Sequence, residues 1–153
     1  MSQSKKGPNK MKLEGMAEVL GAEGTFRGHL RNRIDLIELG KIGLTKAELL
    51  HMADYLDLTI SQLADLLPIT ERTIQRYSDD RHFSPSVSEH ILQIAECTAA
   101  GIRVFEDKGK FLAWLRHPNR ALGQQTPMSL LSSRFGSEMV LDELGRIEYG
   151  VFS

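Results

Sequence analysis

The sequence predicts an all-α fold, and three observations lead to this fold class. Apolar residues recur every three or four positions in several stretches, the longest running from Val87 to Phe105. Helix-start signals stand ahead of these stretches: Thr45 opens a T-x-x-E capping box, and Ser84 and Thr126 each precede a proline. No stretch alternates apolar and polar residues as a half-buried strand does. At 153 residues, the chain is long enough for one domain or two small ones.

The composition is typical of a globular protein. Hydrophobic residues make up 41% of the chain and charged residues 25%, both ordinary values. No apolar run reaches the length of a membrane span, and the start MSQSKKGPNK lacks the apolar core of a signal peptide. The single cysteine, Cys97, excludes an internal disulfide and fits a reducing compartment. We therefore expect a cytoplasmic protein that does not contact a membrane.

Residues 1–24 are expected to form a flexible basic arm. Lys5, Lys6, Lys10 and Lys12 give it the densest positive charge in the chain, and apolar periodicity is absent before Met16. We expect at most one short helical turn in this segment. Such an arm either supplies phosphate contacts on DNA or is only a solvated tail, and the sequence leaves both interpretations open.

Residues 25–106 are expected to form a bundle of helices. A short apolar cluster between Phe26 and Gly40 comes first. Four helices then follow from apolar spacing and from their caps, among them a second capping box at Thr59. Their expected ranges are 46–56, 60–67, 71–78 and 85–105.

The helices at 60–67 and 71–78 have the spacing of a helix–turn–helix that reads DNA. Ala64 is small where the two helices must nearly touch. Ile69, Ile74 and Tyr77 fall where the second helix must pack inward. The outward positions carry side chains suited to base edges and phosphates. The expected DNA-binding residues are Thr70, Glu71, Arg72, Thr73, Gln75 and Arg76.

Two features of this unit differ from a typical DNA reader. Pro68 occupies the turn position where glycine commonly supplies a positive φ, so the turn must have a different shape. Residues 51–102 hold three Lys/Arg against eight Asp/Glu, whereas DNA affinity arises from neutralised phosphates. One copy should therefore bind DNA weakly, and we expect a homodimer over two half-sites. The alternative is a helical hairpin that only packs.

Residues 107–153 are expected to form a small C-terminal module of three short helices. The first, 110–116, ends before Pro118, because a residue that precedes proline is disfavoured in the α region. The second has Thr126 as its N-cap and a proline at its first position. We expect Gly136 to close this helix in a left-handed conformation.

The last helix is expected to begin near Glu138, with Ser137 as its cap. Its apolar residues at helical spacing are Val140, Leu141, Leu144 and Ile147. The chain then ends in large apolar groups from Tyr149 onward, where termini usually become polar. An apolar end indicates a partner.

The run WLRHPNRALGQQTPMSLL and the final GRIEYGV resemble the C-terminal module of the Xre/MbcA/ParS-type antitoxins. The resemblance extends from about Arg33 to the end, and Gln124 stands where the family often has a second glycine. It is most specific at Trp114-Leu115, Pro118-Asn119, Leu122-Gly123, Thr126-Pro127, Gly136 and Arg146 to Val151. It implies an Xre-like helix–turn–helix domain at residues 25–106 and a toxin-binding domain at residues 107–153.

Such antitoxins belong to type II toxin–antitoxin pairs whose toxins carry a RES domain and attack NAD. The resemblance thus implies a protein that occludes the NAD site of a RES-domain toxin and represses its own operon. The implied partners are the cognate toxin, operator DNA, a second copy of the chain and a larger hetero-oligomer with the toxin. The expected toxin-binding residues are Arg146, Glu148, Tyr149, Gly150, Val151, Phe152 and Ser153. Alternatively, the apolar end folds back onto the protein's own core.

The sequence gives no sign of an enzyme. The five histidines include no pair at metal-ligand spacing, and Cys97 lies beside alanines in an apolar helix. Neither a phosphate-binding loop nor a dinucleotide fingerprint occurs. We therefore expect no catalysis, no metal and no cofactor. The alternative function is a free-standing dimeric helix–turn–helix transcriptional regulator without a toxin partner, and the apolar end argues against it.

Overall fold

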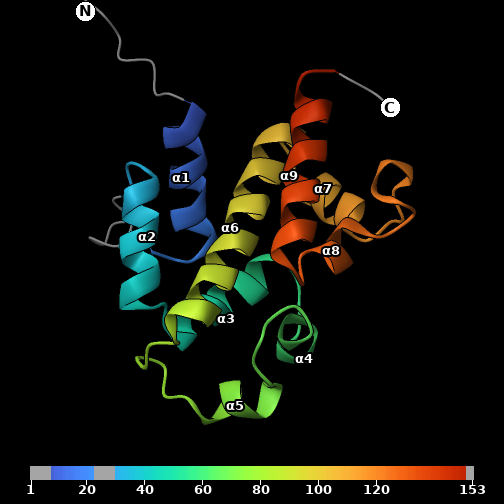
Figure 1. Ribbon diagram of the computed structural model, residues 1–153. Coiled ribbons are helices and arrows are strands. Elements are labelled where there is room, and N and C mark those ends of the chain that lie inside the picture. Colours follow the sequence, from blue (N-terminus) through green and yellow to red (C-terminus); the bar gives the residue numbers. More distant parts are fainter. Residues whose placement is uncertain (1–7, 23–29, 151–153) are drawn as a thin grey trace, which may run out of the picture.

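The computed structural model describes residues 8–22 and 30–150, and their regular structure is helical (Figure 1). The only β pairing in these ranges is two isolated bridges, Thr45 with His82 and Asn119 with Gln125. The all-α fold class is confirmed. None of the helices in the described part is long and apolar enough to cross a membrane. The elements are α1 (Pro8–Val19), α2 (Arg33–Ile42), α3 (Lys46–Tyr55), α4 (Ile60–Ala64), α5 (Glu71–Arg76), α6 (Pro85–Phe105), α7 (Lys108–Leu115), η2 (Arg120–Leu122), α8 (Pro127–Leu130) and α9 (Arg134–Glu148).

The long helix α6 is the element on which the others pack, and its predicted range is confirmed. Between Ile91 and Gly101 nearly every side chain is buried, so the helix must be covered on most sides. α1 and α2 cover one side, while α7 and α9 cover another (Figure 1). The proposed division of the chain between residues 106 and 107 stays a prediction. α6 lies before this boundary and contacts helices on both sides of it.

The predicted starts of α3, α4, α5, α6 and α8 are confirmed, whereas α7 begins at Lys108, after the cap Asp107, and not at residue 110. Thr45 and Thr59 form complete capping boxes with Glu48 and Gln62. The hydroxyls of Thr70, Ser84 and Thr126 each accept a backbone N–H three residues on. The helix ends were predicted less well. α4 ends at Ala64 and not at residue 67, and α5 ends at Arg76 and not at residue 78.

The flexible arm predicted for residues 1–24 is wrong in the part that the structure describes. Pro8–Val19 forms the helix α1, which packs along α6. Leu13, Met16 and Leu20 recur at helical spacing, and all three are buried in the core. Burial of these apolar groups outweighs the tendency of a charged terminus to stay solvated. Lys5 and Lys6 lie outside the described residues.

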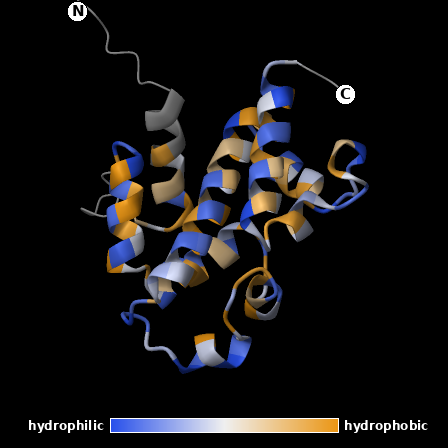
Figure 2. Ribbon diagram, viewed as in Figure 1, coloured by the Kyte–Doolittle hydropathy of each residue, from blue (hydrophilic) through white to orange (hydrophobic). Residues whose placement is uncertain are grey.

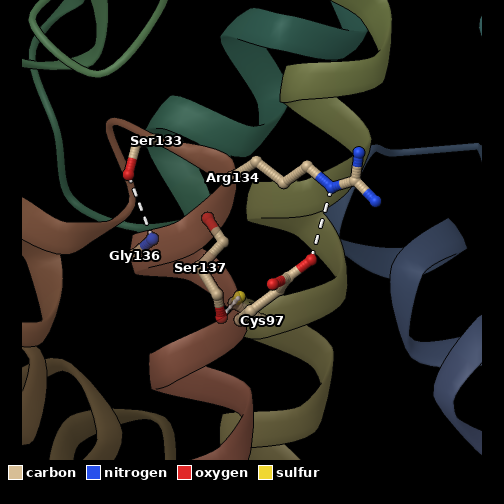
Figure 3. A network of polar contacts seen from close by, with 6 residues as sticks. Cys97, Ser133, Arg134, Gly136 and Ser137 are labelled. Atoms are coloured by element: carbon tan, nitrogen blue, oxygen red, sulfur yellow. Dashed lines mark hydrogen bonds and ion pairs between the residues drawn. The ribbon is translucent and has the colours of Figure 1, made fainter.

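The predicted boundary between the last two helices is also wrong. α9 begins at Arg134, so Gly136 does not close α8 and Ser137 does not cap α9. Ser133 is the cap instead, because its hydroxyl accepts the Gly136 N–H at 3.0 Å (Figure 3). A Cβ on Gly136 would overlap the carbonyl oxygen of Leu130. The glycine is needed for this close approach rather than for a positive φ.

Small residues let α6 and α9 pack closely. The thiol of Cys97 on α6 donates to the backbone carbonyl of Ser137 on α9, with Sγ and O 3.5 Å apart (Figure 3). Both residues are buried. Burial, with the charge of Glu96 as a smaller cause, raises the pKa of Cys97 to about 12. The cysteine is therefore a packing residue that stays protonated at neutral pH.

Candidate functional sites

The unit formed by α4 and α5 has the inward packing that the sequence predicts. Ile74 is fully buried, and Ile69 and Tyr77 pack partly buried against the core. The Tyr77 ring stacks on Phe83 with centroids 4.8 Å apart. The ammonium of Lys46 on α3 donates to the Gln75 and Tyr77 carbonyls at 3.3 and 3.0 Å. These contacts hold α5 in a fixed position at the end of the molecule.

The turn between α4 and α5 differs from a glycine turn, as expected from Pro68. Among the described residues, none from 65 to 69 has a positive φ. Instead, Leu66 and Leu67 donate their N–H groups three residues back, to the carbonyls of Leu63 and Ala64. The chain thus tightens at the end of α4 before it turns.

α5 consists mostly of polar residues, as Figure 2 shows by its mostly blue ribbon. Five of the six predicted DNA-binding residues are exposed, and Glu71 is half-buried. The Glu71 carboxylate accepts a hydrogen bond from the side-chain nitrogen of Gln75 at 3.3 Å, so the side-chain oxygen of Gln75 takes no part in this bond. Arg72 and Arg76 form no ion pair within the described part of the chain. Two unpaired guanidinium groups one helical turn apart suit guanine edges or phosphates.

At the end of α9, two predicted toxin-binding side chains are not free, contrary to expectation. Arg146 pairs with Glu143 one turn earlier at 2.8 Å. Glu148 pairs with Arg103 of α6 at 3.2 Å. The sequence could not show the second pair, since it joins residues 45 positions apart. Both side chains remain part-exposed, so a partner can still contact them.

Beyond these pairs, the chain leaves the helix as predicted. Tyr149 is the C-cap of α9 and is 81% exposed. Gly150 has a φ of 71°, a left-handed conformation that glycine adopts without strain. Val151, Phe152 and Ser153 lie outside the described residues. The large aromatic ring of Tyr149 thus stands in solvent at the point where the helix ends.

Sequence reasoning missed an apolar outer face on α9, defined by Phe135, Met139 and Tyr149. Phe135 is 79% exposed and Met139 is 43% exposed. These three residues lie on one side of the helix over about 20 Å, and the exposed charged residues Asp142 and Arg146 lie on the same side between Met139 and Tyr149. The i, i+4 spacing of Phe135 and Met139 was visible, but the misplaced start of α9 left Phe135 outside the helix. Exposed large apolar groups in a row mark a protein contact.

The described histidines have structural contacts. A ring nitrogen of each lies 2.7–3.0 Å from a backbone carbonyl oxygen. Within residues 8–22 and 30–150, no three His, Cys, Asp or Glu side chains gather as a metal site would require. The residues with these carbonyl contacts are His51, His82, His90 and His117.

Comparisons with known families agree with this geometry. Residues 36–96 match the antitoxin Xre-like helix–turn–helix domain. Residues 100–150 match the antitoxin Xre/MbcA/ParS C-terminal toxin-binding domain. The chain thus carries a helix–turn–helix domain followed by a small helical domain of the toxin-binding kind. The chain belongs to the Xre/MbcA/ParS-type antitoxins.

Three relatives are antitoxins named Xre. That of Yersinia enterocolitica is 39% identical over 80 residues, 52% of this chain and 54% of the relative. That of Photorhabdus laumondii is 32% identical over 94 residues, 58% of this chain and 64% of the relative. That of Pseudomonas putida is 26% identical over 147 residues, 88% of this chain and 91% of the relative. The chain thus spans about half to two thirds of the first two relatives.

A solved structure shares the fold. It is a chain of the M. tuberculosis MbcT–MbcA toxin–antitoxin complex, with a TM-score of 0.51 and 20% sequence identity. The match covers 66% of this chain and 90% of that chain. At this identity the likeness concerns the fold alone.

Proposed function

We propose that this chain is the antitoxin of a type II toxin–antitoxin pair. Its C-terminal module binds a RES-domain toxin and occludes the toxin's NAD site. As a homodimer, it also binds the operator of its own operon through α5 and represses transcription, alone or in a larger complex with the toxin. The observation that carries this proposal is the exposed apolar outer face of α9, which leads directly to the C-terminal end of the chain.

The outer face and the tail suit a concave site. A pocket that binds NAD is a cleft with polar groups for phosphate and ribose, and its blockage requires mainly a matching shape. Phe135 and Met139 supply apolar anchors on the flank, and Tyr149 supplies one at the end. Gly150 turns the chain off the helix axis, so the residues from Val151 to Ser153 act as the plug.

The ion pairs at the end of α9 support this role. The Arg103–Glu148 pair joins the end of α9 to α6 and so holds that end in place before binding. The Glu143–Arg146 pair lies within α9 and orients the Arg146 side chain. A surface ordered in advance loses less conformational entropy on association. The part-exposed charges then contact polar groups at the mouth of the toxin's pocket by charge-assisted hydrogen bonds.

The test is co-expression with a RES-domain protein encoded by a neighbouring reading frame. We expect the two proteins to co-purify, and the purified complex to leave NAD intact where the toxin alone consumes it. If they do not co-purify, and the toxin consumes NAD at its full rate with this chain present, the antitoxin role is excluded. The chain would then be the free-standing dimeric regulator, whose C-terminal module only dimerises.

DNA binding is tested on α5. Arg72→Ala and Arg76→Ala should each weaken operator binding by about 1–3 kcal/mol if the contact is to a base. Arg120→Ala removes an equally exposed arginine from the C-terminal module and serves as the control. Toxin binding should not change in the two α5 variants. Unchanged operator affinity in both α5 variants would exclude these residues from the DNA interface.

A further inference from the structure

A groove of about 560 Å³ runs between α2, α6 and α9. Each of the three helices contributes an apolar residue to it: Leu36 from α2, Leu92 from α6 and Leu141 from α9. Ion pairs within the chain flank these leucines, Arg33 with Glu96 at 2.7 Å and Arg134 with Glu138 at 3.3 Å. None of the lining residues comes from α4, α5 or the end of α9. The groove is therefore separate from α5, and on α9 it borders the outer face, since its lining residues Arg134 and Glu138 are the sequence neighbours of Phe135 and Met139.

The α2 wall of the groove exposes large apolar side chains. Ile37 lines the groove and is 57% exposed, and Ile34, one turn earlier, is 65% exposed. Figure 2 shows this helix with orange segments along its length. Two adjacent exposed isoleucines beside an apolar floor form a contiguous patch, which is typical of a protein interface.

Two charges in the groove are without an ion-pair partner among the described residues. Lys41 on α2 and Glu89 on α6 both line the groove and are exposed. Neither appears in an ion pair within the chain. A two-fold axis makes every cross contact occur twice, so Lys41 of one copy can meet Glu89 of the other, and the reverse. The grooves of two copies are thus complementary in charge to each other.

We infer that a second copy of this chain docks in this groove, with the Ile34–Ile37 ridge of each copy against the apolar floor of the other. The inference names the surface for the self-association in the proposed function, on which it rests. Figure 1 shows α5 beyond the N-terminal end of α6, while the start of α1 and the end of α9 lie near the opposite end. A two-fold axis along α6 therefore leaves both α5 helices at one end of the dimer, as two DNA half-sites require.

Sedimentation equilibrium of the full chain tests this surface. The wild type should be a dimer at micromolar concentration. Ile37→Glu should raise the dimer dissociation constant by about a hundredfold, because it places a charge where an isoleucine is buried. Ile42→Glu is the matched control, since Ile42 is 52% exposed on the same helix but does not line the groove. At concentrations low enough for all three proteins to be monomers, the thermal melts of both variants should equal that of the wild type, because dimerisation itself raises the melting temperature.

The charge pairing has its own test. Lys41→Glu and Glu89→Lys should each weaken the dimer roughly tenfold, and the double variant should return to within about threefold of the wild type. A monomeric wild type, equal effects of Ile37→Glu and Ile42→Glu, or a failure of the double variant to recover would overturn the inference. Toxin binding by Ile37→Glu should stay at the wild-type level, so failure of the antitoxin role is seen separately.

Discussion

The two ends of this molecule expose opposite kinds of surface. At the helix–turn–helix end, the large apolar groups of α4 and α5 pack inward, and the outward face presents Thr, Gln and Arg. Along α9, the outer face presents Phe135, Met139 and Tyr149 to solvent. Polar side chains with free donors suit base edges and phosphates, whereas exposed aromatic and methionine side chains suit a protein partner. Surface chemistry thus distinguishes the proposed DNA-binding surface from the proposed protein-binding surface.

The backbone differs between the two ends in the same way. The turn before α5 contains no left-handed residue in its described positions 65–69. The turn before α8 contains two in succession, Gly123 with φ 67° and Gln124 with φ 65°. The turn before α9 needs Gly136 for a close approach to the end of α8. The turn before α5 thus depends on side-chain packing, whereas the turns before α8 and α9 depend on special backbone positions.

The largest expected effect is at the packing of α5. Ile74 is fully buried and is the only buried residue of that helix. Ile74→Ala should lower the free energy of unfolding by about 2–5 kcal/mol and weaken operator binding, because α5 loses its anchor. Urea denaturation and a DNA-binding assay measure the two effects. Thr73→Ala, at an exposed neighbouring position, should change the stability by much less; an equal loss would contradict the packing role of Ile74.

The next effect is at the start of α9. Gly136→Ala should lower the free energy of unfolding by about 1–3 kcal/mol, since the added methyl group meets the Leu130 carbonyl. Gly145→Ala is a matched control on the same helix, where a Cβ has nothing within 4 Å. It should raise the stability by about 0.5–1 kcal/mol through helix propensity. Denaturation curves in which both variants shift the same way would show that Gly136 has no steric role.

A smaller effect is expected at Gln124. A residue other than glycine in the left-handed region is strained, so Gln124→Gly should stabilise the protein by about 1 kcal/mol. Gly123→Ala, at the preceding left-handed position, should destabilise it by a similar amount. Thermal melts compare the two variants. A loss of stability in Gln124→Gly would mean that the entropy of the unfolded chain outweighs the strain.

Local signals allowed the sequence to predict the starts of α3, α4, α5, α6 and α8 and the inward packing of α5. A capping box such as Thr45 with Glu48 and the Thr70 cap depend only on neighbouring residues, so spacing is sufficient. The end of the chain was predicted less well. The Glu148–Arg103 pair and the contact of Gly136 with Leu130 depend on how helices meet in three dimensions. The same holds for α1, whose burial requires α6 as a partner.

The most direct test of the central claim is deletion of residues 149–153. The truncated chain keeps α9 and the outer-face residues Phe135 and Met139, so it should still fold, dimerise, bind DNA and contact the toxin. NAD consumption by the co-expressed toxin should nevertheless return to nearly the rate without antitoxin, because the plug is absent. If the truncated chain still protects NAD while its melting temperature falls sharply, the end of the chain is part of the core and the account is contradicted.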